Sequence, residues 1–181
     1  ARNRMQLGIT LLDAGKLDEA AVELGEAKRV AQKWIADAGG EMLVIRWNEG
    51  RLLAARGDPA AAEAALVSVI ADCDRASEGH GSESGPMRHS LATLYRRQGR
   101  LAEAERELHR ALRDISIVAG PEHPTTQAIR VELGLVLAGS GRTAEARDQV
   151  DGPPPVRFSE LPATHPMVAE LGALRKALSI P

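Results

Sequence analysis

Apolar side chains along residues 88–112 recur at every third or fourth position, and the pattern is broken once, at Gly99. That spacing places the apolar residues before the break on one face of a helix, and those after it on one face of a second helix. Because glycine readily adopts the left-handed conformation that ends many helices, Gly99 is expected to terminate the first one. The segment therefore predicts two amphipathic helices joined by a tight turn. The residues of the two apolar faces are Leu91, Leu94 and Tyr95 in the first, and Leu101, Ala104, Leu108, Ala111 and Leu112 in the second.

The same pattern occurs four times along the chain, with a period of 42 residues set by Gly15, Gly57, Gly99 and Gly141. Each glycine has residues of matching type at fixed distances on both sides, and such agreement over four copies would hardly arise by chance. The two helices of a copy are expected to cross closely at the small residues, and Asp58-Pro59 is expected to begin a second helix. The matching columns are a small residue seven positions before the glycine (Gly8, Gly50, Ala92, Gly134), a large one four before it (Leu11, Leu53, Tyr95, Leu137), alanine five after it (Ala20, Ala62, Ala104, Ala146) and an aliphatic residue nine after it (Leu24, Leu66, Leu108, Val150).

These columns resemble the tetratricopeptide repeat, an antiparallel helix pair with small residues at its crossing points, and the resemblance covers about residues 2–150. The common form of that repeat has about 34 residues. The period of 42 and the segment "GPEHPTT" at residues 120–126 resemble its kinesin-light-chain-like subclass. The resemblance implies an all-α, right-handed superhelical solenoid of antiparallel helix pairs, in which the first helix of each pair lines a concave, peptide-binding groove. It also implies a fragment of a bacterial multidomain signalling protein, because such arrays are common there.

The repeats are expected to form one domain over residues 1–181, since a single pair cannot bury its apolar faces alone. The fourth copy departs from the pattern because Pro153–Pro155 cut its second helix short. His123-Pro124 recurs 42 residues later as His165-Pro166, which predicts a further helix that caps the stack. The expected parts are helix pairs over about residues 1–38, 39–80, 81–122 and 123–150, an extended linker over 151–164 and a capping helix over 165–180.

Composition agrees with a helical, soluble chain and narrows its partners. Alanine, the best helix former, is the commonest residue, and aromatic residues make up only 2%. The net charge of -2 and the lack of a Lys/Arg run speak against a nucleic-acid partner, and no apolar stretch is long enough to span a membrane. The single cysteine, Cys73, fits a reducing compartment and is expected to be a buried, inert thiol. We expect a cytoplasmic protein without nucleic-acid or membrane partners.

No segment of the sequence has the pattern of a catalytic, cofactor or metal site. Gly139–Ala144 reads G-x-G-x-x-A, but a dinucleotide-binding turn needs β-strands around it and an acidic residue further on, and a triple proline follows instead. In "GHGSESG", residues 79–85, Glu83 stands where a hydrolase elbow requires serine. The histidines lack the spacing of metal ligands, and His123 and His165 are expected to cap helices or pack in loops. We therefore expect a non-catalytic chain with no cofactor and no bound metal.

An arginine stands four positions before each small crossing residue, and this column allows two interpretations. In the first, the aliphatic stem fills space beside the small residue and the guanidinium pairs with a nearby carboxylate. In the second, the arginines form a ladder of positive charge for an acidic partner. The first is favoured, because this helix face is turned toward the partner helix rather than the groove. The column consists of Arg4, Arg46, Arg88 and Arg130.

The family resemblance also implies which side chains line the groove. They lie one and five positions after each arginine of the column, and two further arginines extend the third copy. The expected surface is apolar at both ends and basic in the middle, with Trp47 as either its anchor or an ordinary core residue. The residues are Met5, Ile9, Trp47, Arg51, His89, Thr93, Arg96, Arg97, Val131 and Leu135.

Together these features predict a non-catalytic interaction module that binds a peptide or protein segment, as part of a larger signalling or regulatory protein. One alternative is a self-association scaffold, in which an exposed end repeat stacks on another copy to form a homo-oligomer. Another is a peptide-sensing regulatory domain attached to an enzyme such as a protein kinase. The linker around Phe158, an aromatic residue in an extended segment, is a further candidate occupant of the groove.

Overall fold

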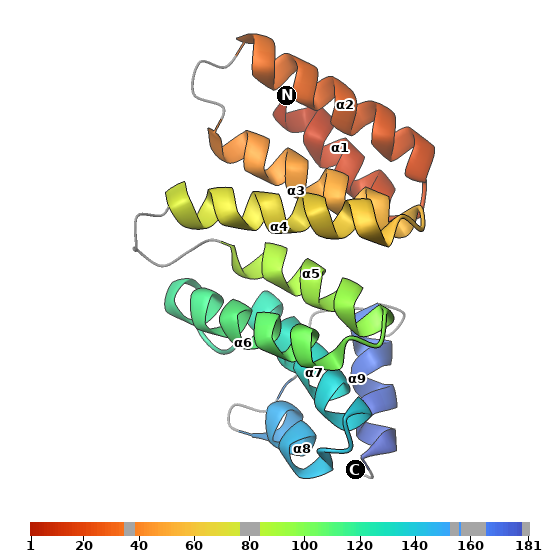
Figure 1. The fold of residues 1–181 in the computed structure, drawn as a ribbon, viewed down its shortest axis with the longest axis vertical. Helices are drawn as coiled ribbons and strands as arrows, with labels where there is room; N and C mark the ends of the chain where they lie inside the picture. Colours follow the sequence, from red (N-terminus) through yellow and green to blue (C-terminus); the bar gives the residue numbers. More distant parts are fainter. Residues whose placement is uncertain (35–38, 77–83, 153–155, 157–165, 179–181) are drawn as a thin grey trace. The chain divides into compact units, whose positions relative to one another are not determined.

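The computed structural model describes residues 1–34, 39–76, 84–152, 156 and 166–178. The chain forms two compact units, Ala1–Glu78 and Gly79–Pro181. All elements within the described residues are α-helices (Figure 1), which confirms the predicted all-α class. Phe158, His80, His165 and most of the expected linker lie outside the described residues.

The first unit consists of two helix pairs. In each pair the two helices run antiparallel and pack along their length. The second helix of the first pair also packs on the first helix of the next pair, and the two first helices contact each other. The helices are α1 (Arg2–Asp13), α2 (Leu17–Trp34), α3 (Gly39–Ala55) and α4 (Pro59–Ala76).

The second unit repeats this arrangement and adds one helix. Its pairs are formed by α5 with α6 and by α7 with α8, and α6 packs on α7 as α2 packs on α3. The additional helix, α9, packs on α7 and α8. The helices are α5 (Gly85–Arg97), α6 (Leu101–Val118), α7 (Pro124–Gly139), α8 (Thr143–Asp151) and α9 (Pro166–Ala177).

A glycine ends the first helix of every pair, as predicted. The four turn glycines have φ values of 73°, 83°, 75° and 77°, in the left-handed region that favours glycine. The residue after each glycine donates its N–H to the carbonyl of the large residue four positions before the glycine, for example Lys16 N to Leu11 O at 2.9 Å. These bonds satisfy carbonyl groups that the end of a helix would otherwise leave open.

Two helix starts follow the expected capping chemistry. The Asp58 carboxylate accepts a hydrogen bond from the Ala61 N–H at 3.0 Å, so it caps α4 ahead of Pro59. The His123 Nδ1 accepts a hydrogen bond from the Thr125 N–H at 3.2 Å, which makes this histidine the cap of α7. The capping role predicted for His123 is therefore confirmed.

The small residues of the repeat mark the points at which the two helices of a pair cross. A Cβ atom added to Gly8 would lie 2.9 Å from Leu24 Cγ, and one added to Gly50 would lie 3.0 Å from Leu66 Cδ2. Both leucines are 1% exposed, so each closes the core over a glycine. The alanine column is buried as well: Ala20, Ala62, Ala104 and Ala146 are all 0% exposed.

The fourth pair completes its crossing in a different way. Its second helix is short, and the aliphatic column holds Val150 where the other copies have leucine. A Cβ atom added to Gly134 would lie 3.7 Å from Val150 Cγ1 but only 2.8 Å from Cδ2 of Leu174, which belongs to α9. The leucine that covers the glycine in this pair therefore comes from a separate, later helix.

Overpacking at the crossing tests this account of the core. We expect Ala104→Leu to lower the free energy of unfolding by about 1–3 kcal/mol, because the residue is fully buried between α5 and α6. Ala102→Leu, on the exposed face of the same helix, is the matched control and is expected to change it by less than about 0.5 kcal/mol. Urea unfolding followed by circular dichroism measures both, and equal effects would contradict the assignment of the crossing point.

Candidate peptide-binding surface

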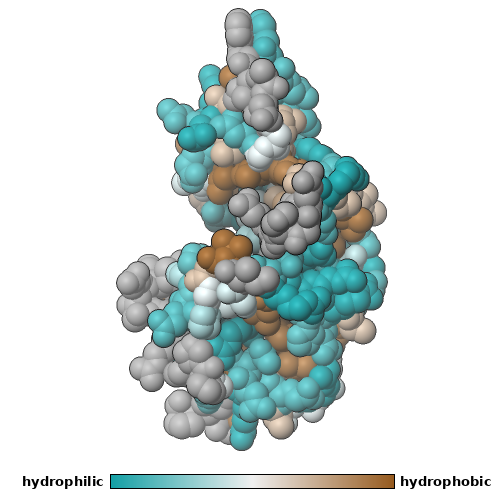
Figure 2. All heavy atoms as spheres, turned by 90° about the vertical axis from the view of Figure 1, so that its left-hand side faces the viewer, coloured by the Kyte–Doolittle hydropathy of each residue, from teal (hydrophilic) through white to brown (hydrophobic). Residues whose placement is uncertain are grey.

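The surface of the chain does not by itself single out a binding site. Hydrophilic residues cover most of the face drawn in Figure 2, and hydrophobic residues appear in smaller areas between them. Isolated apolar side chains of this kind are normal on a soluble protein. The large apolar residues that are most exposed lie on four different helices: Leu7 (48%), Val22 (63%), Val67 (46%) and Val118 (62%).

In the first unit, Trp47 and Arg51 lie one turn apart on α3, and Arg51 is held by several contacts. The Arg51 guanidinium carbon is 5.8 Å from the centre of the Trp47 ring, and its Nη2 donates to Asp13 Oδ1 on α1 at 2.6 Å. Its Nη1 donates to the buried Asn48 Oδ1 at 2.8 Å, and Asn48 Nδ2 in turn donates to Val44 O. Arg51 is therefore held over the half-buried indole by contacts on both first helices.

The α1 residues of the predicted surface are half-buried. Met5 packs against a core cluster of Ala27, Ala31 and Ile45, so a large part of its side chain serves the core. Ile9 lies one turn further along the same helix and is half-buried too. Neither side chain projects freely into solvent.

In the second unit, the predicted residues of α5 differ in how much of each side chain is available. His89 and Thr93 are half-buried, and the Thr93 hydroxyl donates to the His89 carbonyl at 3.1 Å. Arg96 Nε donates to Glu132 Oε1 on α7 at 2.7 Å. Arg97 is exposed.

The predicted α7 residues require a correction. Val131 is 0% exposed, so in this structure it belongs to the core and does not line a surface. The reason is that α7 is packed by α5, α6, α8 and α9, which leaves few of its side chains accessible. Leu135, one turn further on, is half-buried.

The basic centre predicted for this surface is largely neutralised by carboxylates that the pattern of columns did not reveal. Asp13 pairs with Arg51 across 38 positions in the sequence, and Glu132 pairs with Arg96 across 36. Both separations are close to the repeat period, because the two first helices within each unit contact each other. Comparing charges at positions slightly less than one period apart would have found them.

The arginine column proves to tie together the two helices of each copy. Arg88 on α5 is the clearest case: Nη1 donates to Glu107 Oε2 on α6 at 2.9 Å, and Nε lies 3.2 Å from Asp114 Oδ2 on the same helix. The side chains of Arg88 and Glu107 are only 11% and 7% exposed. Nε also donates to the Ser84 hydroxyl at 3.1 Å, so the guanidinium is engaged on three sides.

In the other copies the column arginine also bonds to the second helix or its end, but the acceptor group differs. Arg4 pairs with Glu23 at 3.0 Å, and Arg46 pairs with Asp72 at 2.6 Å. Hydrogen bonds from Arg46 and Arg75 hold the pKa of Asp72 below its usual value. Arg130 donates to the Gly152 carbonyl at 2.9 Å, and burial lowers its pKa. All four arginines therefore bond within their own copy, which supports the structural interpretation over a ladder for an acidic partner.

The segments that resembled other sites fit the helical repeat instead. Gly139 is the last residue of α7, and the turn around Gly141 joins two helices, whereas a dinucleotide-binding turn follows a strand. Most of the segment over residues 79–85 lies outside the described residues. Cys73 is buried and forms no disulfide. Among the residues that the structure describes, no group of His, Cys, Asp and Glu side chains could hold a metal ion, and no helix is long and apolar enough to cross a membrane.

The structural role of the arginine column can be tested at Arg88. We expect Arg88→Ala to lower the free energy of unfolding by roughly 3 kcal/mol, because it leaves the buried Glu107 carboxylate without its main partner. This loss of unfolding free energy is at the low end of the range for breaking a buried ion pair, because Arg110 still lies 3.2 Å from Glu107. Arg113→Ala, an exposed arginine on α6, is the control and is expected to change stability by less than about 0.5 kcal/mol. Thermal and urea unfolding would refute this role if both variants behaved alike.

Comparison with known proteins adds independent information on the repeats. A family model described as a tetratricopeptide repeat matches residues 84–150, and a second model with the same description matches residues 43–67. No curated protein matches the chain.

Among solved structures, a putative kinesin light chain from Podosopora anserina with nearly identical TPR-like repeats is similar to this chain, with a TM-score of 0.70 and 22% identity. The match covers 98% of this chain and 86% of that one, and a crystal structure of a variant of the same protein gives the same values. BtubC (BKLC) from P. vanneervenii matches with a TM-score of 0.73 and 15% identity over 96% of this chain and 70% of that one. At these identities the likeness concerns the fold.

Proposed function

The chain is a tetratricopeptide-repeat protein with the fold of the kinesin-light-chain-like members, and we propose that it binds a peptide or protein segment on the face formed by its first helices. Tetratricopeptide repeats are generally non-catalytic protein-interaction modules. In the proposal this chain has no catalytic activity of its own and acts as part of a larger signalling or regulatory protein.

The observation that carries the proposal is the arrangement of Trp47, Arg51 and Asp13. An indole and a guanidinium lie against each other on α3, and a carboxylate from the neighbouring first helix fixes the guanidinium. Tryptophan and arginine are the side chains that most often dominate binding energies at protein interfaces. Because hydrogen bonds to Asp13 and Asn48 already hold Arg51 in place, this side chain would lose little rotamer freedom on binding.

In this proposal the two units contribute different chemistry to recognition. The α1 and α3 surface offers the ring of Trp47 on α3 and the half-buried aliphatic side chains of Met5 and Ile9 on α1. The α5 surface offers His89, Thr93 and Arg97, of which Arg97 is the exposed positive charge. An apolar side chain of a partner would complement the α1 and α3 surface, and an acidic side chain would complement Arg97 on the α5 surface.

The face of α1 that carries Asn3, Leu7 and Thr10 differs from the corresponding faces of α3 and α7. The corresponding faces of α3 and α7 bury apolar residues on the preceding second helix, such as Ile45 and Ile129, both 0% exposed. On α1 the equivalent position holds the exposed Asn3, and the exposed Thr10 stands where α3 has the buried Leu52. Leu7, which is 48% exposed, lies between these two residues on the same face, so the face combines polar and apolar side chains and the self-association alternative is kept.

Binding through Trp47 and Arg51 can be tested with peptides selected against the chain from a random displayed library. We expect Trp47→Ala and Arg51→Ala each to weaken binding of the selected peptides by about tenfold or more, the usual effect of truncating an anchor residue. Titration calorimetry measures the affinity, and circular dichroism checks that helicity is retained.

Two variants on exposed positions away from this face serve as controls. Val22→Ala on α2 and Arg113→Ala on α6 are expected to leave affinity unchanged, because both side chains project from second helices into solvent. Unchanged affinity in both Trp47→Ala and Arg51→Ala would contradict the proposed surface. So would a library from which no peptide binds the chain.

A further inference from the structure

Helix α9 does not take the place that a further repeat would give it. Within each unit, the first helix of the later pair packs mainly on the second helix before it: α3 on α2, and α7 on α6. The packing between the first helices themselves, α1 with α3 and α5 with α7, is less extensive. Helix α9 reverses this order, because it packs more on α7 than on α8. It therefore occupies a different site on the fourth pair from the one that a fifth pair would use.

Three leucines on one side of α9 make this contact. Leu171, Leu174 and Leu178 are 6%, 1% and 3% exposed, and Leu174 lies over Gly134 of α7. Their spacing of three and four positions places them on one face of the helix. Ala173 and Lys176, which lie between them in the sequence, are exposed. This is the pattern of an amphipathic helix that is held in a groove by apolar anchors.

The face of α7 around Gly134 is more buried than the same face in the other copies. Val131, one turn before Gly134, is 0% exposed. The residues at the equivalent position of the other copies are half-buried: Met5, Trp47 and His89. Of the four first helices, α7 is the one on which α9 packs. The extra burial at this position therefore goes together with the docking of α9.

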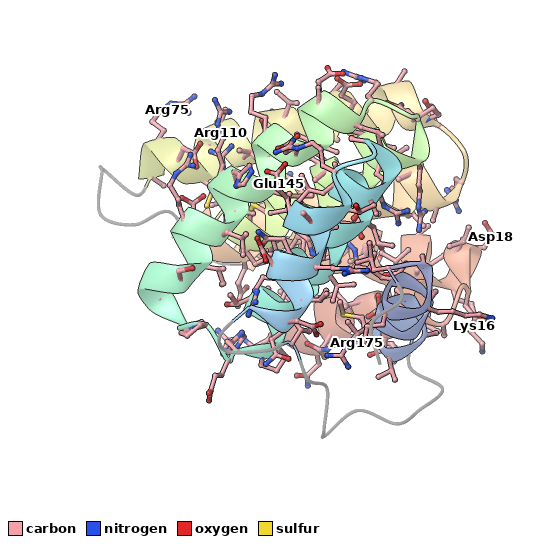
Figure 3. All side chains as sticks on the ribbon, turned by 90° about the horizontal axis from the view of Figure 1, so that it is seen from below. Lys16, Asp18, Arg75, Arg110, Glu145 and Arg175 are labelled. Atoms are coloured by element: carbon pink, nitrogen blue, oxygen red, sulfur yellow. The ribbon has the colours of Figure 1, made fainter. Side chains whose placement is uncertain are left out.

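Charged contacts lie at both ends of the row of leucines. At the start of α9, the Glu170 carboxylate lies 3.8 Å from Arg96 Nη2 on α5. Near its end, Arg175, labelled in Figure 3, donates to the Val156 carbonyl at 3.2 Å and lies 3.4 Å from the Asp151 carboxylate. The site thus selects a helix by an apolar centre and by a charge on either side of it.

No tight turn places α9 on this site. Helix α8 ends at Asp151 and α9 begins at Pro166, so residues 152–165 separate the two. The seat of α9 therefore depends on its side-chain contacts, and the connection acts by keeping the helix at a high local concentration near the site. A helix with the same side chains on another protein would make the same contacts without this connection.

We propose that this face of α7 and α8, together with Arg96, is a docking site for an amphipathic helix of a partner protein, and that α9 occupies the site in the free chain. The partner helix carries leucines with the spacing of Leu171, Leu174 and Leu178, and an acidic residue directly before the first of them. It binds by displacing α9. The site lies within the second unit and does not rest on the proposed role of Trp47.

A fluorescently labelled peptide of residues 165–181 serves as the partner helix in the test. In the intact chain the connected α9 competes with this peptide, so we expect little binding. Leu174→Asp in the full chain removes the anchor over Gly134 and is expected to raise the affinity for the peptide by about 10- to 100-fold, because the connected competitor is lost. Ala173→Asp, on the exposed side of α9, is the matched control and should leave binding as weak as in the wild type. Fluorescence anisotropy measures the affinity, and circular dichroism checks that the helices are retained.

A second measurement empties the site without changing α9. A protease recognition sequence inserted after Phe158 allows the folded full chain to be cut, which removes the connection and keeps every contact of α9. The labelled peptide is then expected to exchange with the released α9. Leu174→Asp in the peptide should abolish this exchange, whereas Ala173→Asp in the peptide should preserve it. If the Leu174→Asp chain loses helicity, the cut chain decides alone.

The proposal is overturned if the peptide binds neither the helical Leu174→Asp chain nor the cut chain. Equal binding of the Leu174→Asp and Ala173→Asp peptides would also contradict it, because the leucine face would then not be what the site recognises. Trp47→Ala, added to the Leu174→Asp chain, is expected to leave the affinity for the peptide unchanged. Failure of the Trp47 surface and failure of the helix site are therefore seen in different measurements.

Discussion

The close crossing of the two helices within each pair is the constraint on which the rest of the structure depends. At Gly8 and Gly50 the facing leucine leaves no room for a Cβ atom, so the helices meet at a fixed point along their length. The turn glycine then sets the number of residues between the start of the second helix and that crossing point. Fixing both points fixes the register of every other contact in the pair. Because each copy has this geometry, residues of the same type recur every 42 positions in the sequence.

The arginine column is a consequence of this register. Once the crossing is fixed, the arginine one turn before the small residue always faces the same stretch of the second helix, so any acidic residue there becomes its partner. The acceptor varies, from Glu23 in the first copy to Glu107 with Asp114 in the third and a backbone carbonyl in the fourth. The position of the arginine is therefore the same in all copies, whereas the group that accepts its hydrogen bonds differs. The positive charges of this column are therefore used inside the repeats.

The sequence predicted what repeats locally and missed what depends on neighbouring helices. The all-α class, the turn glycines, the buried alanine column and the tetratricopeptide-repeat family were predicted correctly, because each follows from spacing within one copy. The burial of Val131 was not predicted, since it depends on how many helices surround α7. Nor were the carboxylates that neutralise Arg51 and Arg96, because they belong to the next or the preceding copy. Whether the remaining first-helix residues line a binding surface stays a prediction.

In the fourth repeat the second helix does not supply the leucine that covers the glycine at the helix crossing. Its second helix ends at Asp151, and Val150 is one methylene shorter than the leucine used elsewhere, so the space over Gly134 is filled by Leu174 of α9. In the other copies the covering leucine is held in place by a helix that follows directly after the turn. Here it is held by a helix at the end of a long connection. The crossing of the last repeat is therefore completed by a helix that belongs to no pair, and it depends on the side-chain contacts of α9 because no tight turn places that helix.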